Sequence, residues 1–183
     1  TLLILYIVYE NHTRNKELLK YAQTDALTGL YNKETTEQLT DELLSEDENK
    51  SHAFLILDVD CFKQINDIYG NAVGDIVLQK FGKLLKGTFR EGDILGRIGG
   101  DEFGVIMKNI QTKDIAMKKA GELLAKTQAY KIDELKGNNI SISIGISTAP
   151  QDGDCYMELY KRADQALYQA KRSGKARVCN YFS

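Results

Sequence analysis

The stretch HAFLILDVD, residues 52–60, constrains the fold of this chain more than any other segment. Its apolar run is continuous rather than alternating, which is typical of a strand that is buried on both faces. Such a strand requires packed layers over each face of its sheet. The chain has 183 residues, of which 43% are hydrophobic, so it can bury a sizeable core as one compact domain with a short appendage.

Local patterns place further elements on both sides of this strand. Asn32 is a good N-cap for a helix over residues 33–44. Alternating β-branched residues indicate a strand over residues 139–148, which Pro150 helps to end. The other expected elements are helices over residues 74–89, 112–130 and 156–170, a hairpin over 97–107 and a closing strand over 176–181. This order predicts an α/β (α+β) sandwich with a central mixed, mainly antiparallel sheet flanked by helices.

Charge and cysteine content exclude several classes of protein. The formal net charge of −2 gives no support for a nucleic-acid partner, so any phosphate binding must come from local groups. The three cysteines, Cys61, Cys155 and Cys179, form no CxxC pair and no Cys/His cluster. We therefore expect neither a disulfide framework nor a zinc site, and a reducing cytoplasm fits best.

The N-terminal segment LLILYIVY, residues 2–9, is apolar throughout. It is shorter than the roughly 20 residues of a membrane span, and it lacks the basic region and cleavage site of a signal peptide. Two alternatives remain: the cytoplasmic end of a span, or a buried segment that packs on a partner. We expect residues 1–23 to form this segment and a linker helix, and residues 24–183 to form the folded domain.

The hairpin sequence RIGGDEFGVIM places two glycines and two acids at its tip. Gly99 and Gly100 suit a turn that needs positive φ angles. Asp101 and Glu102 follow directly, and a solvated turn is the simplest explanation for them. A second pair of acids, Asp58 and Asp60, favours a binding site over a solvated turn.

Asp58 and Asp60 end the buried strand, where an unpaired carboxylate within the core would cost several kcal/mol by rough transfer values. We therefore expect these acids at the rim of the sheet. If the hairpin pairs beside this strand, Asp101 comes next to Asp58, and a divalent cation would relieve the repulsion. Oxygen ligands without Cys or His favour Mg²⁺ or Mn²⁺.

These segments together resemble the GGDEF domain family, the diguanylate cyclases, whose name-giving motif is residues 99–103. The resemblance extends over residues 25–178 and is carried by DALTGLYN (25–32), DVDCFKQINDIYGNAVGD (58–75), SISIGI (141–146) and ADQALYQAKRSGK (163–175). It implies a polymerase-palm-like fold related to nucleotide cyclases. It also implies an enzyme that condenses two GTP into cyclic di-GMP and releases two pyrophosphates.

The resemblance assigns roles to the acids at the rim. It implies two Mg²⁺ or Mn²⁺ ions per active site, held by the side chains of Asp58 and Asp101 and by the carbonyl of Val59. Glu102 would be a further ligand or the group that helps to deprotonate the 3′-hydroxyl. Metals so placed neutralise phosphate charge and lower the pKa of the attacking hydroxyl.

The resemblance also implies a GTP site. Asn66 and Asp75 match guanine-reading positions, and an amide and a carboxylate can satisfy the guanine edge. Without the resemblance, Asn66 would be a helix-internal or capping residue, and Asp75 the N-cap or first turn of the helix after Gly74. The remaining implied substrate positions are Phe62, Lys63, Lys171, Lys175, Gly99 and Gly100, of which Lys63 is also implied in catalysis.

The sequence departs from the family pattern at two positions. Lys175 stands where arginine is more usual, so the charge is kept but the bidentate fork is lost. Lys171 and Lys175 are four residues apart and share a helix face if the helix extends that far. Asn71 replaces a frequent histidine, and we expect little consequence.

REGD, residues 90–93, precedes the glycine pair by five residues and resembles the inhibitory product site of the family. Arg90 can pair with guanine or phosphate, and Asp93 can accept from guanine N–H groups. The alternative is a surface salt bridge between the two side chains.

The resemblance leaves three functions to compare. The first is an active diguanylate cyclase, working as a homodimer and regulated by an upstream sensor and by cyclic di-GMP. The second is a catalytically silent receptor that binds GTP or cyclic di-GMP, and the third is a structural dimerisation domain. None of the motif positions for catalysis is degenerate, which favours the first. We expect a cytoplasmic domain whose parent protein is anchored in the inner membrane if residues 2–9 end a span.

Overall fold

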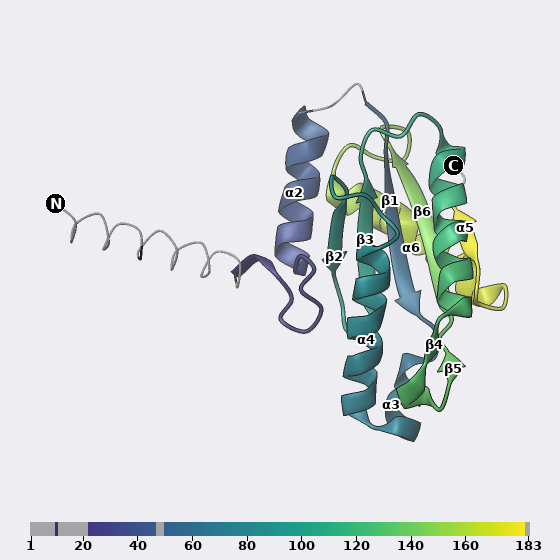
Figure 1. The fold of residues 1–183 in the computed structure, drawn as a ribbon. Coiled ribbons are helices and arrows are strands. Elements are labelled where there is room, and N and C mark those ends of the chain that lie inside the picture. The colour runs from purple at the N-terminus through teal and green to yellow at the C-terminus, as the bar shows by residue number, and fades with distance from the viewer. Residues whose placement is uncertain (1–9, 11–21, 47–49, 182–183) are drawn as a thin grey trace.

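The computed structural model describes residue 10, residues 22–46 and residues 50–181. Five strands form one sheet in the order β2-β3-β1-β6-β7, with helices on both faces (Figure 1). The strands are β1 (His52–Val59), β2 (Ile94–Arg97), β3 (Glu102–Met107), β6 (Ile142–Ala149) and β7 (Val178–Asn180). The helices are α2 (Lys33–Glu46), α3 (Phe62–Tyr69), α4 (Asn71–Lys86), α5 (Lys113–Ala129) and α6 (Tyr156–Arg172). The apolar segment 2–9 lies outside the described residues.

The sheet is mixed and mainly antiparallel, as the sequence predicts. β1 is central and pairs antiparallel with β3 on one side and with β6 on the other. β7 is parallel to β6, and β2 pairs antiparallel with β3 at the opposite edge. Every residue of β1 is buried, which explains why its apolar run is continuous.

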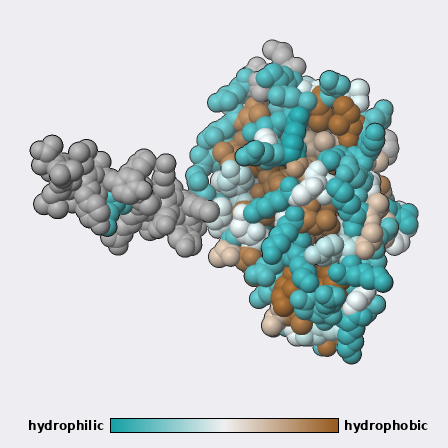
Figure 2. Space-filling model, viewed as in Figure 1, coloured by the Kyte–Doolittle hydropathy of each residue, from teal (hydrophilic) through white to brown (hydrophobic). Residues whose placement is uncertain are grey.

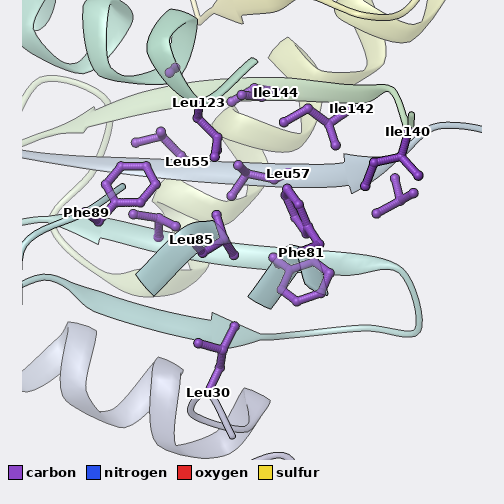
Figure 3. Packing of buried hydrophobic residues seen from close by; sticks show 14 of the residues in the cluster. Leu30, Leu55, Leu57, Phe81, Leu85, Phe89, Leu123, Ile140, Ile142 and Ile144 are labelled. Carbon is purple, nitrogen blue, oxygen red and sulfur yellow. The ribbon is translucent and has the colours of Figure 1, made fainter. Parts of the chain in front are cut away.

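The two faces of β1 have separate hydrophobic cores. On one face, α4 and α5 cover Leu55 and Leu57, and Figure 3 shows Phe81 and Leu123 packed against these two leucines. Rings of Phe81 and Phe103 meet edge to face with centroids 4.9 Å apart. The other face packs Phe54 and Ile56 against residues of α2 and α6.

Small residues on β6 let α6 lie close to the sheet. A Cβ added to Gly145 would stand 2.1 Å from the carbonyl oxygen of Ala163 and 2.3 Å from the amide nitrogen of Leu167. Ser147 Oγ donates to the carbonyl oxygen of Leu159 at 2.8 Å. These contacts fix the position of α6, and its last turn therefore brings Lys171 over the end of β1.

Two helix boundaries differ from the sequence expectation. α4 begins at Asn71 rather than after Gly74, because the break lies at Gly70, whose φ is 87°. Gly74 is instead a packing position inside the helix. α6 ends at Arg172, so Lys175 lies beyond it and does not share its face.

Two further expectations are confirmed, and several short elements are new, among them α3. Asn32 Oδ1 accepts from the backbone N–H of Thr35 at 2.9 Å, as an N-cap should. β6 ends at Ala149, directly before Pro150. The sequence did not predict the small ribbon of β4 (Lys131–Ile132) and β5 (Asn138–Asn139), which is joined by the 3₁₀ turn Asp133–Leu135.

On the face drawn in Figure 2, hydrophobic residues form separate patches interrupted by hydrophilic ones. No helix among the described residues is both long enough and apolar enough to cross a membrane. The three cysteines are free.

Candidate active site

The acids of β1 and of the hairpin meet at one rim of the sheet. Asp58 lies directly opposite Glu102 in the register of β1 and β3. The backbone N–H of Val59 donates to the carbonyl oxygen of Asp101 at 3.2 Å. The expected approach of the two segments is therefore confirmed, with Glu102 rather than Asp101 as the direct cross-strand neighbour of Asp58.

Asp58 is the electrostatic centre of this rim. It is only 7% exposed, and its Oδ2 lies 2.7 Å from Nζ of Lys171. Burial raises the pKa of Asp58 from 3.8 to about 6; Lys171 opposes this rise, and the charges of Asp101 and Glu102 add to it. A carboxylate held this way is stabilised by any cation that approaches it.

Gly99 and Gly100 contribute space beside the acids, rather than the positive φ angles that the sequence predicts. Neither Gly99 nor Gly100 has a positive φ, so the expected turn type is wrong. A Cβ on Gly99 would stand 2.9 Å from Oε2 of Glu102, and one on Gly100 would meet no atom within 4 Å. Gly99 thus makes room for the Glu102 side chain, and Gly100 leaves the tip of the turn open.

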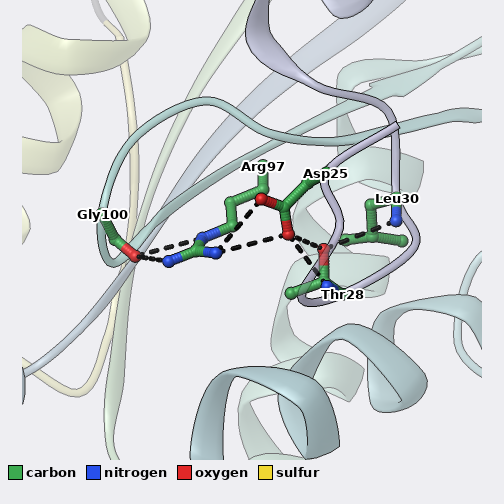
Figure 4. A network of polar contacts seen from close by, with 5 residues as sticks. All are labelled: Asp25, Thr28, Leu30, Arg97 and Gly100. Atoms are coloured by element: carbon green, nitrogen blue, oxygen red, sulfur yellow. Dashed lines mark hydrogen bonds and ion pairs between the residues drawn. The ribbon is translucent and has the colours of Figure 1, made fainter. Parts of the chain in front are cut away.

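The entry turn of the domain is bonded to the glycine turn (Figure 4). Arg97 places NH1 3.2 Å from Oδ2 of Asp25 and donates from NH2 to the carbonyl oxygen of Gly100 at 2.7 Å. Thr28 donates its N–H and hydroxyl to Asp25 Oδ1. Partial burial acts to raise the pKa of Asp25, but the Thr28 hydrogen bonds and Arg97 outweigh it and lower the pKa below 3.8.

The proposed guanine positions meet at the corner between α3 and α4. A Cβ on Gly74 would stand 1.9 Å from Asn66 Oδ1, so the Asn66 side chain lies directly over Gly74. Asn66 Oδ1 is buried without a hydrogen-bond partner among the described residues. Asp75, next to Gly74, is exposed and lies inside α4 rather than at its start. Neither structural explanation for Asp75 holds, since it is neither N-cap nor first-turn residue.

The three expected phosphate lysines occupy different environments. Lys171 is paired with Asp58, and Lys63 is exposed near the start of α3, one residue after the half-buried Phe62. Lys175 Nζ lies 3.0 Å from Sγ of Cys61, which is the residue before α3. The structure therefore brings Lys171 and Lys175 to the end of β1 from α6 and from the loop after it.

Asp60, which the sequence predicts only to lie at the rim of the sheet, has a separate environment in the structure. It is 7% exposed and accepts hydrogen bonds from Ser141 Oγ, from Ser143 Oγ at 2.7 Å and from the N–H of Ala176 at 3.2 Å. Its carboxylate faces β6 and the loop after α6. No local sequence pattern indicates these contacts, because the partners are 81 to 116 residues away.

Arg90 and Asp93 contact each other in the described structure. Arg90 Nε lies 3.0 Å from Asp93 Oδ1, and this oxygen also accepts from the N–H of Lys108 at 3.1 Å. The Arg90 guanidinium also donates to the carbonyl oxygen of Lys108. The Asp93 side chain is 3% exposed and that of Arg90 is 61% exposed, so a ligand would meet the arginine first.

The only preassembled group of three metal-type ligands in the described ranges lies elsewhere. Asp154, Cys155 and Glu158 place one ligand atom each within 4.8 Å of one another, at the end of α6 remote from Lys171. The N–H groups at a helix N-terminus favour negative side chains, which accounts for the two acids there. At the rim, Lys171 takes the place beside Asp58 that a cation would take.

Comparison with known proteins identifies the relatives of this chain. A family model described as "Diguanylate cyclase, GGDEF domain" matches residues 22–177. Diguanylate cyclase A of Treponema denticola is 36% identical over 171 residues, which are 90% of this chain and 46% of that protein. The response regulator PleD of Caulobacter vibrioides is 36% identical over 177 residues, which are 93% of this chain and 39% of that protein. The chain thus spans less than half the length of these two relatives.

Solved structures agree on the fold. The GGDEF domain of TpbB (YfiN) from Pseudomonas aeruginosa superposes with a TM-score of 0.82 at 32% identity, covering 87% of this chain and 94% of that chain. The coiled coil and GGDEF domain of DgcB from Caulobacter crescentus, solved with c-di-GMP, gives a TM-score of 0.87 at 23% identity, covering 96% and 94%. The expected palm-like architecture is confirmed.

Proposed function

The chain belongs to the GGDEF domain family, and on that premise we propose that residues 24–183 form a diguanylate cyclase domain. It condenses two GTP into cyclic di-GMP and two pyrophosphates. The observation that carries the proposal is the cross-strand pair of Asp58 and Glu102, with Asp101 beside it, at the open tip of the glycine turn. A structural dimerisation domain would have no use for a buried carboxylate with a raised pKa at this rim.

The donor set at the rim fits a hard divalent cation. The side chains of Asp58, Asp101 and Glu102 and the carbonyl of Val59 offer only oxygen, and the two neighbouring carboxylates already act on the charge of Asp58. We propose that they hold two Mg²⁺ or Mn²⁺ ions, in exchange for the ammonium of Lys171 at Asp58. Bound there, such ions would neutralise phosphate charge and lower the pKa of the attacking hydroxyl.

GTP would lie between the α3–α4 corner and the glycine turn. We propose that Asn66 and Asp75 bind the guanine edge, because the buried Asn66 Oδ1 lacks a donor and the Asp75 carboxylate is exposed beside it. Phe62 borders the same corner. The phosphates would contact Lys63, Lys171 and Lys175 and approach the open backbone at Gly99 and Gly100.

The chemistry needs two such sites. Each 3′-oxygen forms a bond to the α-phosphorus of the other nucleotide, the bond from that phosphorus to pyrophosphate breaks, and the hydroxyl proton passes to a base. Glu102 would be this base if it is not one of the metal ligands. One chain supplies one set of acids and one guanine corner. We therefore propose a homodimer. We also propose that it is a cytoplasmic domain regulated by an upstream sensor, in a parent protein that is anchored in the inner membrane if residues 2–9 end a span.

The decisive experiment is product analysis with a matched variant. The protein is incubated with GTP and Mg²⁺, and the products are separated by chromatography. We expect cyclic di-GMP from GTP, no turnover of ATP, and a loss of several orders of magnitude for Asp101→Asn with an unchanged melting temperature. A base-edge site can reject the wrong base by about 10⁴-fold.

The second candidate function is a receptor that binds GTP or cyclic di-GMP without turnover. The paired Arg90 and Asp93 would let the domain bind cyclic di-GMP, but such binding is compatible with an active cyclase and does not replace it. Calorimetric binding of GTP without any product would support the receptor and contradict the cyclase. Near-native turnover by folded Asp101→Asn would remove the proposed role of the rim acids.

A further inference from the structure

Asp60 has a hydrogen-bonding arrangement that the proposed catalytic roles do not use. Its Oδ1 accepts from Ser143 Oγ, and its Oδ2 accepts from Ser141 Oγ and from the N–H of Ala176. With three donors on two oxygens and 7% exposure, this carboxylate is directed into the protein. It is therefore unavailable as a further metal ligand, although it is only two residues from Asp58.

The loop after α6 is held by this carboxylate in an unusual backbone conformation. Gly174, Lys175 and Ala176 have φ values of 110°, 60° and 49° in succession. For residues with a side chain, such values are unfavourable, so the loop requires fixed contacts to keep them. Asp60 supplies the contact at the middle of the loop, through Ala176.

Two backbone hydrogen bonds hold the ends of the same loop. The N–H of Lys175 donates to the carbonyl oxygen of Ala170 at 3.1 Å, and the N–H of Ile144 donates to the carbonyl oxygen of Arg177 at 2.9 Å. The loop is thus attached to α6 at its start and to β6 at its end. Between these ends, the N–H of Ala176 donates to Asp60, and Arg177 Nε donates to the carbonyl oxygen of Lys175 at 3.0 Å. Asp60 is thus the contact that attaches the centre of the loop to the end of β1.

The conformation of the loop determines where Lys175 points. Its Nζ lies 3.0 Å from Sγ of Cys61, which is the residue that follows Asp60 in the sequence. The contact with Cys61 raises the pKa of Lys175, and the carboxylates of Asp60 and Asp58 raise it further. The ammonium is therefore charged and lies within the electrostatic reach of Asp58.

We propose that Asp60 is a positioning residue for Lys175. By binding Ser141, Ser143 and Ala176 together, it fixes the loop so that the lysine ammonium stands beside the rim where the phosphates of GTP would lie. The proposal rests on the proposed cyclase function for its kinetic consequence, but the loop contact itself does not. It also explains how lysine can serve at a position where the family more often has arginine.

The kinetic test is a double-mutant cycle of Asp60→Ala and Lys175→Ala. Each single variant should raise KM for GTP about tenfold, as expected for one lost charge-assisted hydrogen bond, with a smaller change in kcat. The double variant should be no worse than Lys175→Ala alone, because Asp60 acts through the lysine. Asp60→Asn should restore most of the loss, since an amide oxygen can accept from Ala176 while its NH₂ donates to a serine hydroxyl. Asp164→Ala, an exposed change on α6, is the matched control.

A second measurement needs no activity. Trypsin cleaves after Lys175, and the cut is identified by the mass of the fragments. We expect faster cleavage there in Asp60→Ala, a smaller increase in Ser141→Ala, and wild-type rates in Asp60→Asn and Asp164→Ala. If Asp60→Ala does not fold, Ser141→Ala and Asp60→Asn carry both tests.

The outcomes separate this proposal from the proposed function. A wild-type protein that makes no cyclic di-GMP but shows the expected cleavage pattern would refute the cyclase and keep the loop contact. Additive losses in the cycle, a fall in kcat of several hundredfold with unchanged KM, or cleavage that does not respond to Asp60→Ala would overturn the positioning role.

Discussion

At the scale of single residues, Asp58 occupies a position that suits the proposed binding of a cation but lowers the stability of the folded protein at neutral pH. Its carboxylate is buried among other acids, so its pKa is raised from 3.8 to about 6 despite the pairing with Lys171. In the unfolded chain the same group ionises near its ordinary value. Between these two values the folded state binds more protons than the unfolded state, so the unfolding free energy falls as the pH rises through this range.

We therefore expect the stability of metal-free protein to depend on pH through Asp58. Relative to Asp58→Asn, the wild type should lose about 2 kcal/mol of unfolding free energy between pH 4 and pH 7, because most of the effect of a pKa raised from 3.8 to about 6 falls within this range. Urea denaturation in EDTA at several pH values measures this. Mg²⁺ at pH 7 should stabilise the wild type and leave the variant unchanged. A difference between the two proteins that is constant with pH would contradict the assigned environment.

The pair of Arg90 and Asp93 yields a second prediction at this scale. The exposed guanidinium is available to a guanine or a phosphate, whereas Asp93 is buried and holds the loop through Lys108. We expect Arg90→Ala to keep the initial rate and to abolish the slowing as cyclic di-GMP accumulates. Asp93→Ala should in addition lower the melting temperature. Calorimetry with added cyclic di-GMP measures binding at this site. If cyclic di-GMP does not bind to the wild type, Arg90 and Asp93 form only a salt bridge and no product site.

At the scale of elements, the sequence predicts most of the fold because buried elements have strong local patterns. The apolar run of β1 and the apolar stripe of α6 identify both elements, and Asn32 marks the start of α2. The failures have local causes. Gly74 reads as a helix start but is a contact point for Asn66, and Gly99 reads as a turn residue with positive φ but makes room for Glu102.

The candidate site could be predicted in part because its residues lie at fixed spacings within the motifs. The positions of Asp58, Asp101, Asn66 and Asp75 follow from motif spacing. The contacts of Arg97 with Asp25 and of Asp60 with Ala176 join residues 72 and 116 positions apart, and no local pattern encodes them. Such contacts depend on how the elements pack, which requires the structure.

The contact between Asp25 and Arg97 links the entry turn to the glycine turn and gives a prediction for these elements. We expect Arg97→Ala to lower kcat by at least tenfold while GTP binding changes little, because the guanidinium holds the carbonyl oxygen of Gly100 and not the nucleotide. Asp25→Ala should have a weaker effect in the same direction, and the double variant should be no worse than Arg97→Ala. A thermal melt checks folding. Independent, additive losses would show that the two turns are not coupled.

At the scale of the whole molecule, one described chain has one rim of acids, at Asp58, Asp101 and Glu102, and one corner of α3 and α4 where Asn66 lies over Gly74. If these are the metal and guanine sites that we propose, one chain can bind a single GTP. A product that joins two GMP units symmetrically requires two such half-sites facing each other, in keeping with the two-fold symmetry usual in homodimers. Holding both nucleotides in this way can remove about 7–11 kcal/mol from the barrier. Control of pairing would therefore be control of the enzyme.

The final prediction concerns this pairing. Specific activity should rise with protein concentration. If the apolar segment 2–9 packs on a partner rather than ending a span, deletion of residues 1–21 should weaken dimerisation and lower activity at a given concentration. The deletion should stop before Ala22 because the carbonyl oxygens of Ala22 and Gln23 accept from Asn32 at 2.7 and 2.9 Å, and losing them would disturb the entry turn itself. Sedimentation with GTP present measures the association, and the melting temperature of the shortened chain controls for folding. Specific activity that does not change with concentration, from a species that remains monomeric with GTP bound, would exclude the half-site arrangement for this protein.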